Sequence, residues 1–279
     1  MTNPEIGRNI ICGPFTTNYH DVGSGDAVLM LHGSGPGVSA WANWRLVFQY
    51  LQYSFRLLAP DLAGFGYTSS PEGTVHGRAS WLEQIIRLMD ALSLDRAHVI
   101  GNSFGGSMAL ALAIAYPDRV RRLVLMGSVG VPFELTPGLD AVWGYEPSTD
   151  NMQAIMRLFA YDQSLVGDAL VKMRYEASIR PGIHEEYSRM FPAPRQRWVD
   201  AMAHEERDIR ALRHPTLLVH GRDDKVIPLS TSITLLNWIE NSQLHVFGRC
   251  GHWTQIEQAP AFCRLVTDFI KLSGTAPGS

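Results

Sequence analysis

The chain has 279 residues, of which 46% are hydrophobic and 18% are charged, and its formal net charge is -3 at pH 7. A chain of this length can bury one large core, and it lacks the basic excess that binds a nucleic-acid backbone. Cys12, Cys250 and Cys263 are far apart and form no CxxC pair, which argues against a disulfide framework and a thiolate metal site. We therefore expect reduced thiols, no cofactor, no metal and a small-molecule partner.

The first ten residues include an acid and no apolar run, so they do not resemble a secretory signal. No stretch of the sequence approaches the roughly 18 uninterrupted apolar residues that a membrane helix needs. The sequence therefore predicts a cytoplasmic protein that does not enter a membrane.

Short apolar runs bounded by turn residues recur along the chain. They cover residues 27–31, 55–60, 97–101, 122–127, 216–221 and 243–248, and an earlier pair of strands is expected within residues 8–22. Continuous apolar runs are typical of strands that are buried on both faces, as in a parallel sheet. Helical stretches at 81–92, 107–116, 230–240 and 261–270 lie between these runs, so the order predicts a doubly wound α/β sheet.

The stretch between the strand that ends near Gly127 and the strand that begins at Thr216 is much longer than a strand-to-helix connection. It contains helical segments at 151–162, 164–178 and 194–209, with breaks at Pro147, Pro181, Gly182 and Pro192. We therefore expect a helical lid over residues 132–209, inserted into a core that is formed by residues 1–131 and 210–279.

The pentapeptide at residues 101–105, GNSFG, is a G-x-S-x-G motif that follows a predicted strand and precedes a predicted helix. In this setting the motif is a sharp turn that lifts the serine hydroxyl above the sheet, and the helix amino terminus favours anionic intermediates. A structural Gly/Ser turn is the alternative, but the context favours a nucleophile at Ser103. Together with the element order, the motif predicts the α/β-hydrolase fold, with a mostly parallel eight-stranded sheet and helices on both faces.

A serine nucleophile needs a base, and histidine has the pKa that suits this task near neutral pH. His252 closely follows the last predicted strand, so we expect it over the same sheet edge as Ser103. Other histidines lie in or at the end of predicted strands, where a hydrogen-bonded structural role is the simpler interpretation: His32, His98, His220 and His245.

In this fold the acid lies between the serine and the histidine in chain order, after the penultimate strand. Asp223 and Asp224 are both candidates, and Asp224 is favoured because it matches the acid of the family pattern H-G-x-x-D-x-x-V/I-P. Its expected role is to fix the imidazole tautomer and stabilise the imidazolium. Asp61, which also follows a strand, is interpreted as a residue that caps the N–H groups of a turn.

The loop at residues 32–37, HGSGPG, follows the first parallel strand. From this position the fold donates one N–H group of an oxyanion hole, and the residue after the nucleophile donates the other. This assigns the backbones of Ser34 and Phe104 to the hole. A phosphate-binding loop is the alternative, but neither G-x-x-x-x-G-K-[ST] nor a spaced G-x-G-x-x-G is present.

Four segments taken together, at residues 32–44, 101–106, 138–145 and 248–258, resemble those of the bacterial meta-cleavage product hydrolases. The chain is most similar to the 2-hydroxymuconate semialdehyde hydrolases and the hydrolases of monoalkylbenzene degradation. The resemblance implies hydrolysis of the C5–C6 bond of a 2-hydroxy-6-oxohexa-2,4-dienoate to 2-hydroxypenta-2,4-dienoate and a carboxylic acid. It also implies a homodimer or a higher homo-oligomer. A serine carboxylesterase is the alternative function.

The resemblance further implies how the substrate is held. Asn43, Asn102, Arg174 and the Trp253 indole would bind the carboxylate and the 2-hydroxy end. The wall around the C6 group would be formed by Leu139, Trp143, Phe159, Val226 and Ile227. The residues alone leave other roles open, namely a surface ion pair for Arg174, a helix cap for Asn43 and a turn for Asn102.

Overall fold

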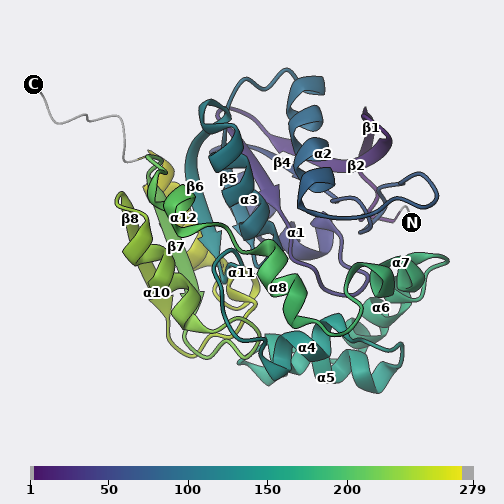
Figure 1. The fold of residues 1–279 in the computed structure, drawn as a ribbon. Helices are drawn as coiled ribbons and strands as arrows, with labels where there is room; N and C mark the ends of the chain where they lie inside the picture. The colour runs from purple at the N-terminus through teal and green to yellow at the C-terminus, as the bar shows by residue number, and fades with distance from the viewer. Residues whose placement is uncertain (1–2, 272–279) are drawn as a thin grey trace, which may run out of the picture.

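One sheet of eight strands runs through the computed structural model, which describes residues 3–271 (Figure 1). The strand order is β1-β2-β4-β3-β5-β6-β7-β8; β1 pairs antiparallel with β2, β2 pairs antiparallel with β4, and the later pairs are parallel. The strands are β1 (Arg8–Cys12), β2 (Phe15–Gly23), β3 (Ala27–Leu31), β4 (Arg56–Pro60), β5 (Ala97–Asn102), β6 (Val120–Met126), β7 (Thr216–Gly221) and β8 (Ser242–Phe247). The predicted mostly parallel sheet is confirmed.

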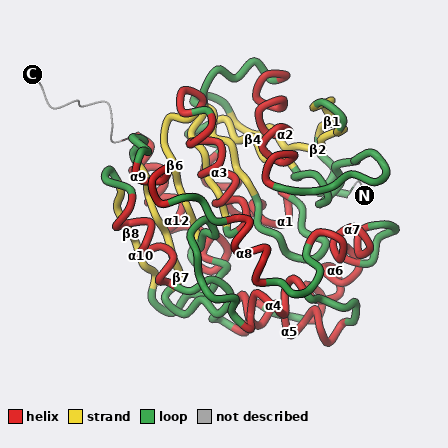
Figure 2. The backbone as a smooth tube through the Cα atoms, in the orientation of Figure 1, coloured by secondary structure: helices red, strands yellow, loops and turns green. Residues whose placement is uncertain are grey.

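Helices cover both faces of this sheet, as Figure 2 shows with the strands in yellow between red helices. α1 (Ala40–Leu51) and α12 (Ala259–Lys271) pack on one face, where Phe262, Val266 and Phe269 of α12 are buried at helical spacing. The other face carries α2 (Arg78–Ala91), α3 (Phe104–Ala115) and α10 (Leu229–Trp238). The sheet is therefore the middle layer of three, as a doubly wound fold requires.

The chain between β6 and β7 forms six α-helices and one 3-10 helix. They are α4 (Pro137–Trp143), α5 (Thr149–Phe159), η2 (Gln163–Leu165), α6 (Asp168–Ser178), α7 (Ile183–Met190), α8 (Gln196–Met202) and α9 (Glu206–Arg210). The side chains of Thr136 and Ser148 cap the amino termini of α4 and α5. α4 to α7 gather beyond one end of the sheet (Figure 1). The remaining short helices are η1 (Pro117–Arg119) and α11 (Thr254–Glu257).

Several predicted elements differ from the observed ones. The predicted helix at 194–209 divides into α8 and α9, because the His204 N–H donates to the Gly130 carbonyl at 2.9 Å instead of continuing a helix. The predicted helix at 164–178 similarly divides into η2 and α6. β8 is half exposed although its apolar run predicted burial on both faces, because it is the last strand of the sheet and pairs with β7 alone. The sequence did not predict α1, α4, α7 or α11.

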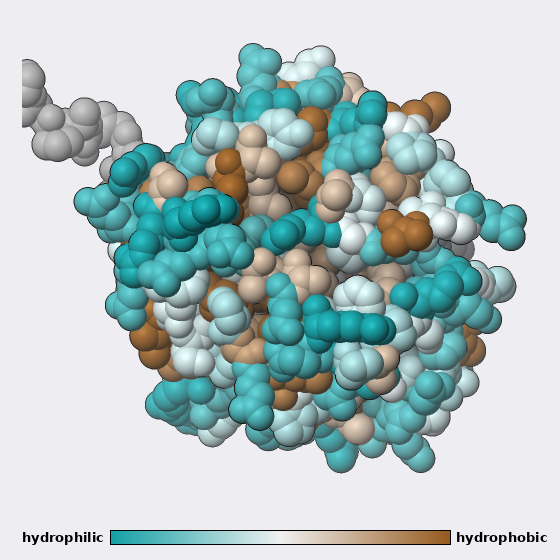
Figure 3. Space-filling model, viewed as in Figure 1, coloured by the Kyte–Doolittle hydropathy of each residue, from teal (hydrophilic) through white to brown (hydrophobic). Residues whose placement is uncertain are grey.

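The surface is polar over most of the face seen in Figure 3, where hydrophobic residues are scattered among hydrophilic ones. None of the helices within residues 3–271 has the length and apolar character that crossing a membrane requires. Cys12, Cys250 and Cys263 are all buried free thiols, in agreement with the expectation from their spacing.

Candidate active site

Ser103 occupies the turn between β5 and α3, with a φ of 54° and a ψ of −115°. Such a conformation costs a residue with a Cβ about 1–3 kcal/mol and persists where the surroundings enforce it. Here the Ser103 N–H donates to the Met126 carbonyl at 2.8 Å, and its carbonyl accepts from Gly106 and Val129 at 2.9 and 3.1 Å. The fold therefore holds the serine in a strained turn at the end of a central strand.

His252 and Asp224 form a close pair that is shielded from solvent. The distance from His252 Nδ1 to Asp224 Oδ2 is 2.7 Å, and the two side chains are 6% and 1% exposed. The second carboxylate oxygen accepts from the N–H groups of Val226 and Ile227 at 2.7 and 3.0 Å. Since Nδ1 donates to the carboxylate, Nε2 is the nitrogen that can act as a base.

Burial alone would raise the pKa of the Asp224 carboxyl, but the charge of His252 and the hydrogen bond from it hold the pKa below its ordinary value. Asp224 is therefore ionised at neutral pH and can stabilise an imidazolium. Asp223, the other candidate acid, lies 3.5 Å from Arg222 and accepts from the Cys250 N–H at 3.4 Å. The geometry brings Asp224, and not Asp223, to the histidine.

The loop that carries His252 is fixed against the inserted helices. The Trp253 N–H donates to the Phe159 carbonyl at the end of α5 at 3.1 Å, and the Gly251 N–H donates to Glu257 at 2.7 Å. The Phe159 ring also stacks on the His252 ring at a centroid distance of 5.6 Å. The imidazole is thus held by both the core and the insertion.

The Gly-rich loop after β3 passes beside Ser103. A Cβ built on Gly33 would lie 3.5 Å from the Ser103 Cβ, so a side chain at this position would contact the serine. The neighbouring Ser34 is held through its carbonyl by Tyr187 at 2.9 Å and through its hydroxyl by Trp143 at 3.0 Å. Among the described residues the backbone N–H groups of Ser34 and Phe104 have no protein acceptor, as a pair of oxyanion donors requires.

Ser103, Ser34 and His252 border a cavity of about 230 Å³. Its apolar lining includes Val38, Leu46, Leu139, Val142, Met152, Ile155, Met156, Phe159, Leu165, Leu170, Val226 and Ile256. Leu139, Phe159 and Val226 lie where the sequence analysis expected the wall. Trp143 and Ile227 do not line the cavity: Trp143 lies behind Ser34 and stacks on Phe191, at a centroid distance of 4.8 Å.

The polar residues expected at the carboxylate end, Asn43, Asn102, Arg174 and Trp253, all line this cavity. Asn43 Oδ1 accepts from the Gly33 N–H at 3.4 Å, whereas its Nδ2 is buried without a partner among the described residues. Asn102 Nδ2 donates to the Met126 carbonyl at 3.4 Å. Asn43 lies inside α1, whose cap is Ser39, so the alternative role of Asn43 as a helix cap is wrong.

Arg174 is buried and already has protein partners. Its Nη1 lies 3.1 Å from Glu5 Oε1, and its Nη2 donates to the Gly37 carbonyl. Burial lowers the pKa of Arg174, and the Glu5 carboxylate opposes that effect. An exposed surface ion pair, the alternative interpretation of this arginine, does not describe the observed position.

The other histidines near the site are buried and neutral. Burial lowers the pKa of His32 to about 4, and its Nε2 accepts from the Leu62 N–H at 2.9 Å. His220 contacts Ser232 at 2.8 Å and the Ile227 carbonyl at 3.0 Å.

Asp61 has the capping role that was expected for it. Its carboxylate accepts from the backbone N–H groups of Ala40 and Tyr67 at 2.6 and 2.7 Å.

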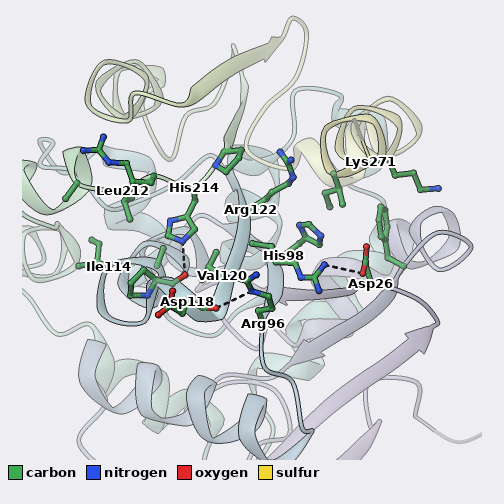
Figure 4. A pocket seen from close by; sticks show the side chains of 18 of the residues that line it. Asp26, Arg96, His98, Ile114, Asp118, Val120, Arg122, Leu212, His214 and Lys271 are labelled. Atoms are coloured by element: carbon green, nitrogen blue, oxygen red, sulfur yellow. Dashed lines mark hydrogen bonds and ion pairs between the residues drawn. The ribbon is translucent and has the colours of Figure 1, made fainter. Parts of the chain in front are cut away.

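A larger hollow of about 990 Å³ opens at the opposite, amino-terminal edge of the parallel strands. Figure 4 shows it lined by Arg96, His98, Arg122 and Lys271 among others. It contains none of the motif residues. Volume alone therefore does not single out a candidate site, whereas the convergence of Ser103, His252 and the N–H groups of Ser34 and Phe104 does.

Two charged residues of this region were not predicted from the sequence: Arg45 in the cavity lining and Glu5 behind Arg174. Ala42, Asn43, Arg45 and Leu46 line the cavity at the spacing of a helix face. Predicting a helix from the Ser39 cap would have placed Arg45 one turn after Ala42, on the face that lines the cavity. No local pattern indicates Glu5, which is 169 residues from its partner.

Comparison with known proteins agrees with this geometry. The model of the family described as alpha/beta hydrolase fold matches residues 26–259. The chain is 60% identical over 268 residues to a 2-hydroxy-6-oxo-2,4-heptadienoate hydrolase of Pseudomonas putida strain F1, which covers 96% of this chain and 97% of that protein. It is 58% identical to a 2-hydroxymuconate semialdehyde hydrolase of Pseudomonas sp. strain CF600, over 97% of this chain and 95% of the relative.

The chain is also similar to a solved structure of a meta-cleavage product hydrolase. The meta-cleavage product hydrolase CumD of Pseudomonas fluorescens IP01, as an S103A mutant complexed with acetates, superposes with a TM-score of 0.96 at 54% identity. The match covers 98% of this chain and 100% of that one. The similarity therefore extends over both the sheet and the inserted helices.

Proposed function

The chain belongs to the meta-cleavage product hydrolases of the α/β-hydrolase family, and we propose that its substrate is a 2-hydroxy-6-oxohexa-2,4-dienoate with hydrogen or a small alkyl group at C6. Like its relatives, it is a carbon–carbon bond hydrolase of aromatic catabolism. The products are 2-hydroxypenta-2,4-dienoate and a carboxylic acid. The observation that carries this proposal is a single cavity that joins Ser103 and His252 to Arg174 and to an apolar wall.

Ser103, His252 and Asp224 are the proposed triad. The substrate carboxylate and 2-hydroxy group bind at Arg174, Asn43, Asn102 and the Trp253 indole, which places C6 beside Ser103. The Ser34 and Phe104 N–H groups, which lack protein acceptors, then receive the oxygen on C6. Leu139, Phe159 and Val226 are proposed to surround the C6 group, and the cavity volume of about 230 Å³ supports a small substituent at C6.

The reaction proceeds in two stages, and His252 transfers protons in both. First the 2-hydroxyl proton is lost and C5 gains a proton, which gives a 2,6-dioxo compound. Oxygen then adds to C6, either from water that His252 activates or from Ser103; on the serine route water subsequently hydrolyses the acyl-serine and releases the carboxylic acid. The C5–C6 bond breaks, and its electron pair is delocalised onto the 2-oxo group because an unactivated carbanion would leave too slowly. A burst of the pentadienoate product before steady state would identify the serine route.

Residues 132–209 are proposed to act as a lid on a core of residues 1–131 and 210–279. Support comes from the cavity, which lies between the two parts: Ser103 and His252 line it from the core, and Met152, Ile155 and Arg174 line it from the insertion.

We further propose a cytoplasmic homodimer. Three free thiols fit a reducing compartment, and light scattering of the purified protein tests the dimer.

The test of the proposed function is a comparison of kcat/KM for yellow dienoates that carry hydrogen, methyl, isopropyl or phenyl at C6, with 4-nitrophenyl acetate as a simple ester. We expect the hydrogen and methyl compounds to be the best substrates and the ester to be poor. Efficient ester hydrolysis without dienoate turnover would instead indicate a carboxylesterase.

A further inference from the structure

Two arginines line the catalytic cavity, Arg174 from α6 and Arg45 from α1. Arg174 has its charge balanced by Glu5, whose side chain is 10% exposed and whose Oε1 lies 3.1 Å from Nη1. Its Nη2 donates to the Gly37 carbonyl. Two of the five guanidinium N–H donors are thus already used, and the positive charge already faces a carboxylate.

Arg45 differs from Arg174 in the partners of its guanidinium. Its Nη1 donates to the Ala42 carbonyl of its own helix at 2.7 Å, and within residues 3–271 no carboxylate oxygen lies within 4.0 Å of its guanidinium. Burial lowers the pKa of Arg45 and Glu5 opposes the shift, so the group stays protonated at neutral pH. A half-buried guanidinium without a carboxylate partner within 4.0 Å keeps N–H donors free to bind an anionic ligand in the cavity.

The charges around this end of the cavity leave an excess of one positive charge. At the end of the cavity formed by α1 and α6, Arg45 and Arg174 carry two positive charges, and Glu5 supplies one negative charge behind them. Asp61 lies nearby, but its oxygens accept from Ala40, Tyr67 and Asn18, and burial raises its pKa to about 7. The Arg180 guanidinium is turned toward the Gly66 carbonyl and the Tyr67 ring.

We propose that Arg45 is a specificity-determining residue, which binds the carboxylate of an anionic substrate together with Arg174. This inference rests on the proposed function. Glu5 orients Arg174 and neutralises it, and Arg45 supplies the charge that selects a monocarboxylate over a neutral ester. A hydrogen bond to a charged group is lost when Arg45 is removed, which corresponds to about tenfold or more in affinity.

The variants that test this are Arg45→Gln and Arg45→Met, the second of which keeps an apolar stem along the cavity. Arg264→Gln is the matched control, because it makes the same charge change at an exposed position of α12. For 2-hydroxy-6-oxohepta-2,4-dienoate we expect KM to rise about tenfold or more in both Arg45 variants, with a smaller change in kcat. The ratio of kcat/KM for the dienoate to kcat/KM for 4-nitrophenyl acetate should therefore fall in both Arg45 variants, and circular dichroism and the thermal midpoint, compared with Arg264→Gln, show that the variants fold.

A binding measurement separates this inference from the proposed function. Hexa-2,4-dienoate, a simple anion of similar shape, is used as a competitive inhibitor of 4-nitrophenyl acetate hydrolysis. Its inhibition constant should rise about tenfold in the Arg45 variants and stay unchanged in Arg264→Gln. Equal inhibition constants in wild type and Arg45→Gln would overturn the role of Arg45. A wild-type enzyme that binds the anion through Arg45 but leaves the heptadienoate uncut would overturn the proposed function alone.

Discussion

The two carboxylate oxygens of Asp224 have different partners: Oδ2 lies 2.7 Å from His252 Nδ1, whereas Oδ1 accepts from the backbone N–H groups of Val226 and Ile227. The backbone bonds fix the carboxylate, and the carboxylate in turn fixes the imidazole. An acid on a flexible side chain thereby becomes a rigid acceptor for one nitrogen of the histidine.

Replacement of Asp224 by Asn should lower kcat for the dienoate by about four orders of magnitude, because the amide no longer enforces the reactive tautomer. Asp223→Asn is the control, since Asp223 contacts Arg222 and Cys250 instead of the histidine. Steady-state kinetics on both variants provide the measurement. Comparable losses in the two variants would argue that the acid was assigned to the wrong residue.

The pH dependence of stability should carry a contribution from Asp224. Its pKa is lower in the folded protein than the ordinary value of 3.8, so the unfolded chain takes up this proton first as the pH falls. The stabilisation is complete above the unfolded pKa and is lost as the pH falls through the folded pKa. Urea unfolding at pH 7 and at about pH 3 should therefore show a smaller acid-induced loss in Asp224→Asn than in wild type. An identical loss would contradict this assignment.

Glu5→Gln should destabilise the protein, because it leaves the buried Arg174 charge without its carboxylate partner. Breaking a buried pair from one side costs about 3–5 kcal/mol, whereas an exposed pair contributes less than about 1 kcal/mol. The matched control is Glu83→Gln, which removes a half-exposed pair with Arg87. Urea unfolding should show a clear loss of stability for Glu5→Gln and little change for Glu83→Gln; similar midpoints would mean that the buried pair contributes little.

Gly105→Ala should distort the turn that carries Ser103. A Cβ at Gly105 would lie 2.2 Å from the Leu31 carbonyl oxygen, and a strand backbone cannot move aside without disturbing the sheet. Overpacking of this kind costs about 1–3 kcal/mol or more. Gly167→Ala is the control, because a Cβ there meets nothing within 4 Å. The thermal midpoint should fall in Gly105→Ala and stay unchanged in Gly167→Ala. A Gly105→Ala protein that is as stable and active as wild type would refute the packing argument.

Val226→Ala should shift the preference toward larger C6 groups. Val226 lines the cavity and is buried, so its truncation enlarges the wall beside the proposed C6 position. Discrimination per methylene in an apolar pocket is about 1–3 kcal/mol. The ratio of kcat/KM for the 6-isopropyl and 6-methyl dienoates should rise accordingly. An unchanged ratio would place the C6 group against a different part of the lining.

The predicted triad depended on chain order, since the carboxyl ends of parallel strands meet at one edge of a sheet. Ser103, Asp224 and His252 each follow a strand of this kind, so three short segments were enough to place them. Strand positions were also readable, because continuous apolar runs mark the buried strands. β8 has such a run as well, yet its exposure depends on its place at the edge of the sheet, and an apolar run does not report strand order.

What the sequence did not reveal was set by long-range contacts. Glu5 meets Arg174 only because the inserted helix α6 folds back over the amino-terminal segment. Arg45 was missed because α1 was not predicted. Trp143 was expected in the wall, but its indole N–H needs an acceptor and finds Ser34 Oγ, which holds the ring behind the loop.

The most direct test of the central claim is turnover of 2-hydroxy-6-oxohepta-2,4-dienoate by the wild-type enzyme and by Ser103→Ala, followed through the loss of the yellow absorbance and by identification of the products. We predict that wild type releases 2-hydroxypenta-2,4-dienoate and acetate in equal amounts, and that Ser103→Ala loses about three orders of magnitude or more in kcat while still folding. A Ser103→Ala enzyme with wild-type activity, or a wild-type enzyme that leaves the C5–C6 bond intact, would contradict the account.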